Sequence, residues 1–314
     1  MAPASGQPIL LGKKPDWFKV RRQHGQNYLE LKSIMREQSL HTVCEEARCP
    51  NVYECWERRT ATFMILGNLC TRACRFCNVA WGRPTSVDLE EPARVATAVE
   101  QMGLKFAVVT SVNRDDLPDG GASIFAATIR EIRQRLPDCG VEVLIPDFKG
   151  NWDALREVVD AKPDILNHNV ETVPRLFRRV QPWDRYDVSL DLFSKVREFD
   201  SGMITKSGVM VGLGETKDEL VDVMKALRGR DVDVLTIGQY LPPSKRHFPL
   251  DRYYTPEEFA ELRDIGYQLG FGHVESGPMV RSSYHARDQA EELKLRRLRE
   301  QKRQAAGEMG SISE

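Results

Sequence analysis

Two groups of three cysteines are the residues of this sequence best suited to bind metal. They are the first cysteine group, Cys44-x4-Cys49-x5-Cys55, and the second cysteine group, Cys70-x3-Cys74-x2-Cys77. Together they contain six of the seven cysteines in the 314-residue chain. Clustered thiolates bind zinc or iron–sulfur clusters, but each group is one ligand short of the usual four. A metal with an open position can bind a substrate or cofactor directly, which indicates chemistry rather than a structural role.

The second cysteine group admits two interpretations. A zinc site needs a fourth Cys or His, and the nearest downstream candidates, Cys139 and His168, lie in the body of the chain. Cys139 precedes an apolar run, and we interpret it as a small buried hydrophobe. A [4Fe–4S] cluster can instead leave one iron free for a small molecule. We favour the cluster because the apolar run at 63–67 predicts a buried strand that ends just before Cys70.

These residues resemble a known family. Cys70, Cys74 and Cys77, with Phe76 before the last cysteine, match the three-cysteine loop of the radical S-adenosylmethionine (SAM) enzymes. The first cysteine group and the late tetrapeptide Arg-Ser-Ser-Tyr at 281–284 narrow the match further. From about residue 14 to about residue 286, the sequence resembles the lipoyl synthase family.

The resemblance implies two [4Fe–4S] clusters with different roles. The second cysteine group would hold the catalytic cluster, whose open iron chelates SAM and whose electron cleaves it to a 5′-deoxyadenosyl radical. The first group, with Ser283 as fourth ligand, would hold a cluster that is consumed as the sulfur source. A serine oxygen binds iron less readily than a thiolate, which suits a cluster that must be dismantled. The expected reaction inserts sulfur at C6 and C8 of an octanoyl chain on a carrier lysine.

Hydrophobic periodicity predicts strands alternating with helices. We expect strands at residues 62–67, 106–110, 141–146, 165–170, 204–211 and 232–237, and helix-capping boxes at Thr216 and Thr255. The alternation predicts a parallel sheet with right-handed crossovers, either open and doubly wound or a partial barrel. The resemblance implies an α/β fold of the second kind, a partial (β/α)6 barrel. We expect an N-terminal extension over 1–58, the barrel over 59–272 and a C-terminal extension over 273–314.

Functional groups of such a barrel lie at the carboxyl ends of its strands. Ser111 follows the second expected strand, whereas Asn169 and Glu171 end the fourth, where polar groups are unusual for a strand buried on both faces. Together with Phe76, these residues are our candidates for SAM binding. The turn at 119–121, Asp-Gly-Gly, fits a ligand contact and a simple glycine turn equally well.

Composition excludes other classes of protein. The chain has 45 Lys and Arg against 46 Asp and Glu, so it has no net positive charge that would attract nucleic acid. No apolar run approaches the roughly 18–20 residues of a membrane span, and the N-terminus lacks the order of a secretory signal. We therefore expect a cytoplasmic protein that binds neither nucleic acid nor membrane. Its expected partners are an octanoylated carrier protein, an electron donor and an iron–sulfur cluster carrier.

The two ends of the chain and two rival functions stay open. The basic stretch at 13–22 is either a surface segment whose aromatic residues pack on the main domain or a docking patch for an acidic partner. The charged residues at 287–305 predict a solvated terminal helix followed by a disordered tail. The rival functions are another radical SAM sulfur transferase, such as a methylthiotransferase, and a non-enzymatic protein with two clusters. The latter would need four protein ligands per cluster.

Overall fold

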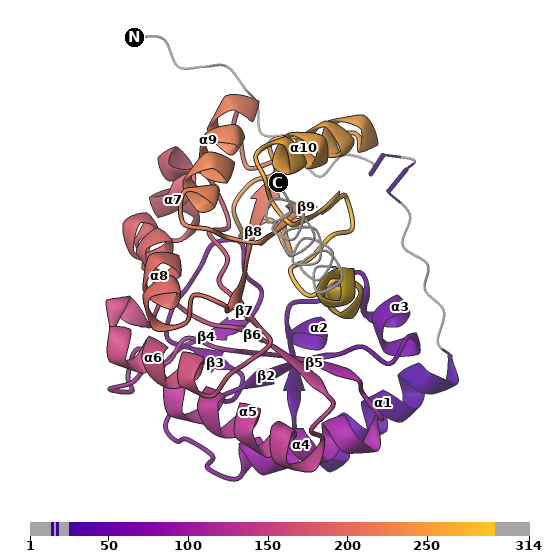
Figure 1. The fold of residues 1–314 in the computed structure, drawn as a ribbon. Coiled ribbons are helices and arrows are strands. Elements are labelled where there is room, and N and C mark those ends of the chain that lie inside the picture. The colour runs from indigo at the N-terminus through magenta and orange to yellow at the C-terminus, as the bar shows by residue number, and fades with distance from the viewer. Residues whose placement is uncertain (1–13, 16, 19–24, 293–314) are drawn as a thin grey trace, which may run out of the picture.

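A curved eight-stranded sheet forms the centre of the protein in the computed structural model, which describes residues 14–15, 17–18 and 25–292 (Figure 1). Its strands follow the order of the chain: β1 (His41–Thr42), β2 (Thr62–Ile65), β5 (Phe106–Ser111), β6 (Gly140–Leu144), β7 (Ile165–Asn167), β8 (Ile204–Val211), β9 (Val234–Gln239) and β10 (His273–Gly277). β1 pairs antiparallel with β2, and the remaining neighbours are parallel. Since the described edge strands β1 and β10 do not pair with each other, the barrel is incomplete.

Helices connect the parallel strands and lie on the outside of the curved sheet (Figure 1). They are α4 (Glu91–Gln101), α5 (Ala122–Arg135), α6 (Trp152–Asp160), α7 (Pro174–Val180), α8 (Tyr186–Phe199), α9 (Lys217–Arg228) and α10 (Pro256–Gln268). The predicted capping boxes are confirmed at the starts of α9 and α10, where Thr216 pairs with Glu219 and Thr255 with Glu258. In the described part of the chain, no helix is both long and apolar enough to cross a membrane.

All six predicted strands are present, but the sequence analysis missed strands at both edges of the sheet. β10 has the polar sequence His-Val-Glu-Ser-Gly and pairs only with β9, so it carries no apolar run by which to recognise it. The predicted end of the fourth strand at Val170 was wrong, because β7 already ends at Asn167. Beyond it, Glu171 takes the left-handed value φ +62° and keeps only an isolated bridge to Val209.

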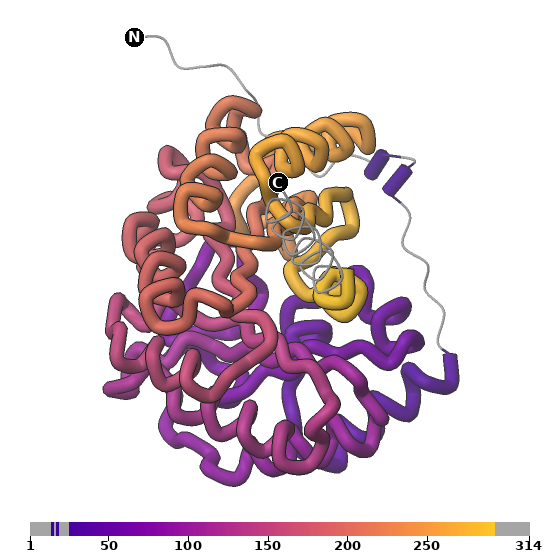
Figure 2. Tube along the Cα trace, viewed as in Figure 1, coloured from indigo at the N-terminus to yellow at the C-terminus, as the bar shows by residue number. Residues whose placement is uncertain are grey.

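The N-terminal segment packs beside the carboxyl-terminal part of the barrel. Three short helices, α1 (Gln26–Glu37), α2 (Val43–Glu46) and α3 (Val52–Glu57), lead into β2. Figure 2 shows this indigo region next to the yellow segment that follows β10, and Asn51 Nδ2 donates to the carbonyl of Met279 at 2.7 Å. Segments next to the two opposite edge strands, β1 and β10, therefore contact each other.

The predictions for the two ends of the chain can be checked only where the structure describes those residues. Phe18 is buried, and both Trp17 and Phe18 lie against the ring of Tyr253, which confirms that these aromatic residues pack on the main domain. Residues 13, 16 and 19–22 of the basic stretch, and the tail after residue 292, lie outside the described residues. Residues 286–292 are helical, in agreement with the expected start of a terminal helix. Cys139 is buried, as predicted.

A buried ion pair crosses the inside of the barrel. Lys206 Nζ on β8 lies 3.0 Å from Glu142 Oε1 on β6, and both side chains are fully buried. Asn167 Nδ2, on the intervening strand β7, donates to the same carboxylate at 3.0 Å. Burying either charged group without its partner would cost free energy of folding. The strands are therefore stabilised in the alignment that brings these side chains together.

Removing the lysine should therefore destabilise the barrel. Lys206→Met leaves Glu142 without a counter-charge and is expected to lower the free energy of unfolding by about 3–5 kcal/mol. Lys225→Met is the control, because Lys225 forms only an exposed pair with Asp222 and should cost less than about 1 kcal/mol. Urea unfolding of the cluster-free proteins measures both values. An equally small decrease in the free energy of unfolding in both variants would contradict a buried, charged pair.

Candidate functional site

The second cysteine group lies on a loop at the carboxyl ends of the barrel strands. Cys70 ends β3 (Leu69–Cys70), which forms a small parallel sheet with β4 (Ala80–Trp81), and Cys74 and Cys77 lie on the loop between them. The loop contacts two other strand-end loops. Thr71 N donates to the carbonyl of Asn113 after β5 at 3.0 Å, and the carbonyl of Arg75 accepts from Phe248 N after β9 at 2.8 Å. We call residues 70–77 the cysteine loop.

The surroundings of the cysteine loop affect the protonation of its sulfur atoms. The Cys70 sulfur accepts hydrogen bonds from the backbone amides of Arg72 at 3.4 Å and Asn113 at 3.3 Å. Burial raises the pKa of Cys77 to about 11, and burial together with the charge of Asp184 raises the pKa of Cys74 well above its ordinary value. Thiolates are therefore disfavoured here until a metal neutralises them, so binding of iron would displace protons.

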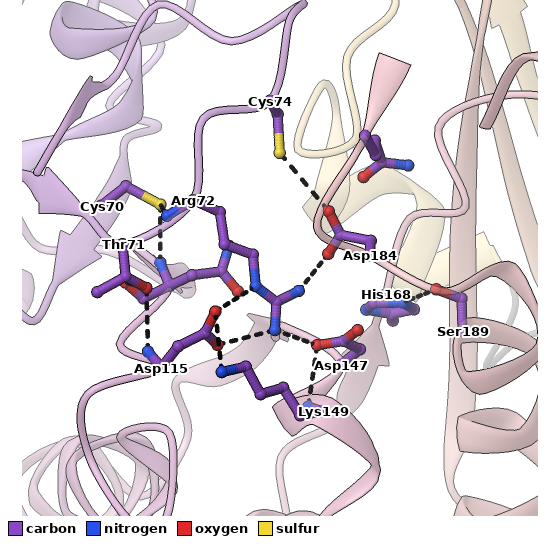
Figure 3. A network of polar contacts seen from close by, with 12 residues as sticks. Cys70, Thr71, Arg72, Cys74, Asp115, Asp147, Lys149, His168, Asp184 and Ser189 are labelled. Carbon is purple, nitrogen blue, oxygen red and sulfur yellow. Dashed lines mark hydrogen bonds and ion pairs between the residues drawn. The ribbon is translucent and has the colours of Figure 1, made fainter. Parts of the chain in front are cut away.

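A buried guanidinium anchors the cysteine loop to the barrel (Figure 3). Arg72 binds Asp115 through two hydrogen bonds of 2.8 Å, Asp147 through one of 2.7 Å, and Asp184 through Nη1. Asp115 follows β5, Asp147 follows β6, and Asp184 follows α7. Burial alone would lower the pKa of Arg72, but the bonds to Asp115 and the charges of Asp184 and Asp147 outweigh it and raise this pKa. One side chain of the loop is thus bound to three separate loops of the barrel mouth.

The residues predicted to bind SAM lie at the ends of β5 and just beyond β7. Ser111 Oγ and Asn169 Oδ1 are buried and have no hydrogen-bond partner within the described residues. Asn169 Nδ2 donates to Glu171 Oε1 at 3.1 Å, and burial raises the pKa of Glu171 to about 7. The Glu171 carboxylate lies near enough to Cys77 to raise the pKa of its thiol. Unpartnered buried polar atoms beside a cysteine loop fit a polar cofactor that would satisfy them.

Several neighbouring candidates make local contacts. Asp119 accepts from the amides of Gly121 and Ser123 at 3.0 and 2.9 Å, so the Asp-Gly-Gly turn starts α5 and its carboxylate is already used. His168 is buried, with its ring nitrogens 2.9 Å from the carbonyl oxygen of Ile145 and 3.0 Å from Ser189 Oγ. Phe76 is half-buried and packs against the main hydrophobic core.

The first cysteine group lines a cavity together with residues from the far end of the chain. We call it the second cavity, because none of its lining residues belongs to the cysteine loop. This cavity is small, with a volume of about 20 Å³. Its walls include the three thiols and the predicted fourth ligand: Cys44, Cys49, Cys55, Arg281, Ser283 and Tyr284. The Ser283 hydroxyl forms no hydrogen bond with any residue that the structure describes. Three thiols and one free hydroxyl facing one cavity fit a cluster with three sulfur ligands and one oxygen ligand.

Local contacts keep the first cysteine group in place. Cys49 N donates to the carbonyl of Cys44 at 3.0 Å, which bends the chain between α2 and α3. Burial, reinforced by the neighbouring thiol of Cys49, raises the pKa of Cys44 to about 11. Burial likewise raises the pKa of Cys55. Tyr284 links the C-terminal segment to α3, because its hydroxyl donates to Glu54 at 3.3 Å.

The zinc interpretation requires a fourth ligand beside the second cysteine group. Cys139, one of its two candidates, directly precedes β6 and so lies at the opposite end of the strands from the cysteine loop. His168, the nearest histidine candidate, already uses both nitrogens.

The sequence analysis missed Arg72 and its three carboxylates. Arg72 stands inside the recognised cysteine spacing, but its partners lie 43, 75 and 112 residues away. A signal was available, because Asp115 and Asp147 each follow a predicted strand end. Nothing in the sequence indicated that they share one guanidinium.

Arg72 can be tested by a substitution that keeps its charge. Arg72→Lys cannot bind three carboxylates in the planar geometry of a guanidinium, so we expect iron binding about 10- to 100-fold weaker in chelator competition after anaerobic reconstitution. Arg185→Lys, which alters only an exposed pair with Asp187, is the control. Iron retention equal to the wild type in Arg72→Lys would show that the anchor is dispensable.

Comparison with known proteins finds close relatives over most of the chain. The family model of the radical SAM superfamily matches residues 64–227, and that of the N-terminal domain of lipoyl synthase matches residues 10–49. The lipoyl synthase of Rubrobacter xylanophilus is 60% identical over 90% of this chain and 88% of the relative. That of Roseiflexus sp. is 60% identical over 89% of this chain and 93% of the relative.

Solved structures share the fold at much lower identity. Methylornithine synthase (PylB) superposes with a TM-score of 0.50 at 12% identity, over 79% of this chain and 81% of that one. HydG, a maturase of the [FeFe]-hydrogenase, superposes with a TM-score of 0.55 at 18% identity, over 73% of this chain and 54% of that one. These similarities support the predicted partial barrel.

Proposed function

The chain belongs to the lipoyl synthase family of radical SAM enzymes, and we propose that it uses two [4Fe–4S] clusters to insert sulfur at C6 and C8 of a protein-bound octanoyl chain. The observation that carries the two-cluster proposal is the second cavity. It gathers three cysteines from the N-terminal segment and a free serine hydroxyl from the C-terminal segment around one space. A single-cluster enzyme would have no use for this arrangement.

At the cysteine loop, we assign Cys70, Cys74 and Cys77 as ligands of the catalytic cluster. When bound, this cluster and SAM supply a one-electron cleavage that removes hydrogen atoms from unactivated carbon. Ser111 Oγ and Asn169 Oδ1 offer unpartnered polar atoms to SAM, and Glu171 offers a carboxylate near Cys77. Phe76 packs on the core and holds the loop close to the barrel. Enclosure by the strand-end loops keeps water and competing hydrogen donors away.

In the second cavity, we assign Cys44, Cys49, Cys55 and Ser283 as ligands of the cluster that serves as the sulfur substrate. Ser283 is the ligand suited to leave, because an oxygen donor holds iron less firmly than a thiolate. Arg281 is half-buried and lines the cavity near Cys49, where it places a positive charge against the anionic sulfurs. When bound, this cluster would supply the two sulfur atoms, its iron would take up one electron for each C–S bond formed, and it would have to be rebuilt after each turnover.

Three partners follow from this chemistry. The substrate is an octanoyl-lysine on a carrier domain, whose long arm must reach between the two clusters. An electron donor reduces the catalytic cluster, and an iron–sulfur carrier restores the second. We propose that residues 1–58 and 273–314 act as extensions that hold the second cluster against a barrel formed by residues 59–272.

The oxygen ligand can be tested with two substitutions at one position. Ser283→Ala removes the ligand, so we expect SAM cleavage to continue while lipoyl product falls about 10- to 100-fold or more. Ser283→Cys should retain iron yet also lower product formation, because a thiolate leaves iron less readily. Mass spectrometry of the carrier and quantification of 5′-deoxyadenosine measure the two activities.

Ser282→Ala is the matched control, since Ser282 adjoins Ser283 but does not line the cavity. It should form lipoyl product at the wild-type rate. Full product formation in Ser283→Ala would remove this serine from the mechanism.

A further inference from the structure

Positively charged side chains without acidic partners surround the cysteine loop. We define the basic face as the exposed residues Arg75, Arg178, Arg179, Lys245 and Arg246. None of the five forms an ion pair with another described residue, although Arg179 lies over the ring of Phe248 at 5.4 Å. By contrast, the nearby Arg175 and Arg185 are paired with Glu219 and Asp187.

Three segments bring these cations together around the catalytic cysteines. Arg75 lies on the cysteine loop, and its amide donates to the carbonyl of Val180 at the end of α7, at 2.9 Å. Its carbonyl accepts from the amide of Phe248, in the loop after β9 that also carries Lys245 and Arg246. In that loop, His247 Nε2 lies 3.1 Å from the carbonyl oxygen of Cys77. The basic face therefore borders the backbone of two residues of the cysteine loop directly.

The composition of this surface is that of an interface for an acidic protein. The contacting segments 74–83, 174–183 and 241–250 contain not one Asp or Glu, in a chain whose overall charge is nearly balanced. Two large exposed side chains, Trp81 and Trp183, stand on the same segments, 69% and 63% exposed. Arg and Trp are enriched in protein interfaces, and unpaired surface charge steers an oppositely charged partner.

We propose that the basic face is the docking surface for the electron donor, an acidic protein that carries a low-potential flavin or iron–sulfur centre. This inference rests on the proposed function, in which one electron passes to the catalytic cluster for each SAM cleaved and the donor is oxidised by one electron. Electron transfer falls steeply with distance, so the donor must bind close to the cysteine loop. The carrier protein must instead deliver its octanoyl-lysine arm between the two clusters, and none of the five cations of the basic face lines the second cavity. A small, charge-steered contact suits a transient redox partner.

The test compares a protein donor with a small chemical one. Holoenzymes of the wild type and of Lys245→Glu/Arg246→Glu receive electrons from reduced acidic ferredoxin or from dithionite, and SAM cleavage is followed in the presence of octanoylated carrier. We expect the KM for ferredoxin to rise about tenfold or more at low salt, and the difference to shrink at high salt. With dithionite, the variant should cleave SAM and form product at the wild-type rate.

The matched control is Lys105→Glu/Arg130→Glu, which reverses two exposed charges. Lys105 directly precedes β5, at the opposite end of the strands from the cysteine loop, and Arg130 lies on α5. An equal rise in the KM for ferredoxin in the control would overturn the proposal, as would no rise in the test variant. A raised KM for the carrier with dithionite as donor would assign the face to the carrier instead. If ferredoxin-driven SAM cleavage behaves as expected but no lipoyl group is formed by the wild type, the proposed function fails while the docking surface stands.

Discussion

The pairing of one buried guanidinium with three aspartates determines the position of the cysteine loop, where we propose that the catalytic cluster forms. Arg72 belongs to the cysteine loop, whereas Asp115, Asp147 and Asp184 belong to the barrel. Each of these charges would be unfavourable in the protein interior without the others. The loop is therefore held at the carboxyl ends of the strands, the edge at which Ser111 and Asn169 present unpartnered polar atoms.

A second constraint operates between the two ends of the chain. The first cysteine group comes before β2, and its fourth candidate ligand comes after β10, so neither segment completes the cavity alone. Asn51 and Tyr284 provide contacts that join them. Sheet formation accounts for this meeting, because β1 and β10 are the edges of one incomplete barrel. An open barrel leaves room beside its mouth for a second cluster, which a closed barrel would exclude.

Much of this arrangement could be predicted from the sequence, because it depends on spacing along the chain. The cysteine loop, the capping boxes at Thr216 and Thr255 and the six apolar strands are all local patterns. The strand β10 was missed because an edge strand with the sequence His-Val-Glu-Ser-Gly has no apolar signature. Arg72 was missed because pairing across up to 112 residues is decided by the fold. The serine ligand was predicted only through family resemblance, since a serine pair in a loop carries no signal of its own.

The central claim, that the chain holds two clusters with different roles, is tested most directly by counting iron. Iron and acid-labile sulfide per chain are measured after anaerobic reconstitution of the wild type and of a Cys44/Cys49/Cys55→Ala triple variant. We predict about eight irons falling to about four, with SAM cleavage retained and lipoyl formation lost. Four irons in the wild type, or zinc in place of iron, would contradict the two-cluster mechanism.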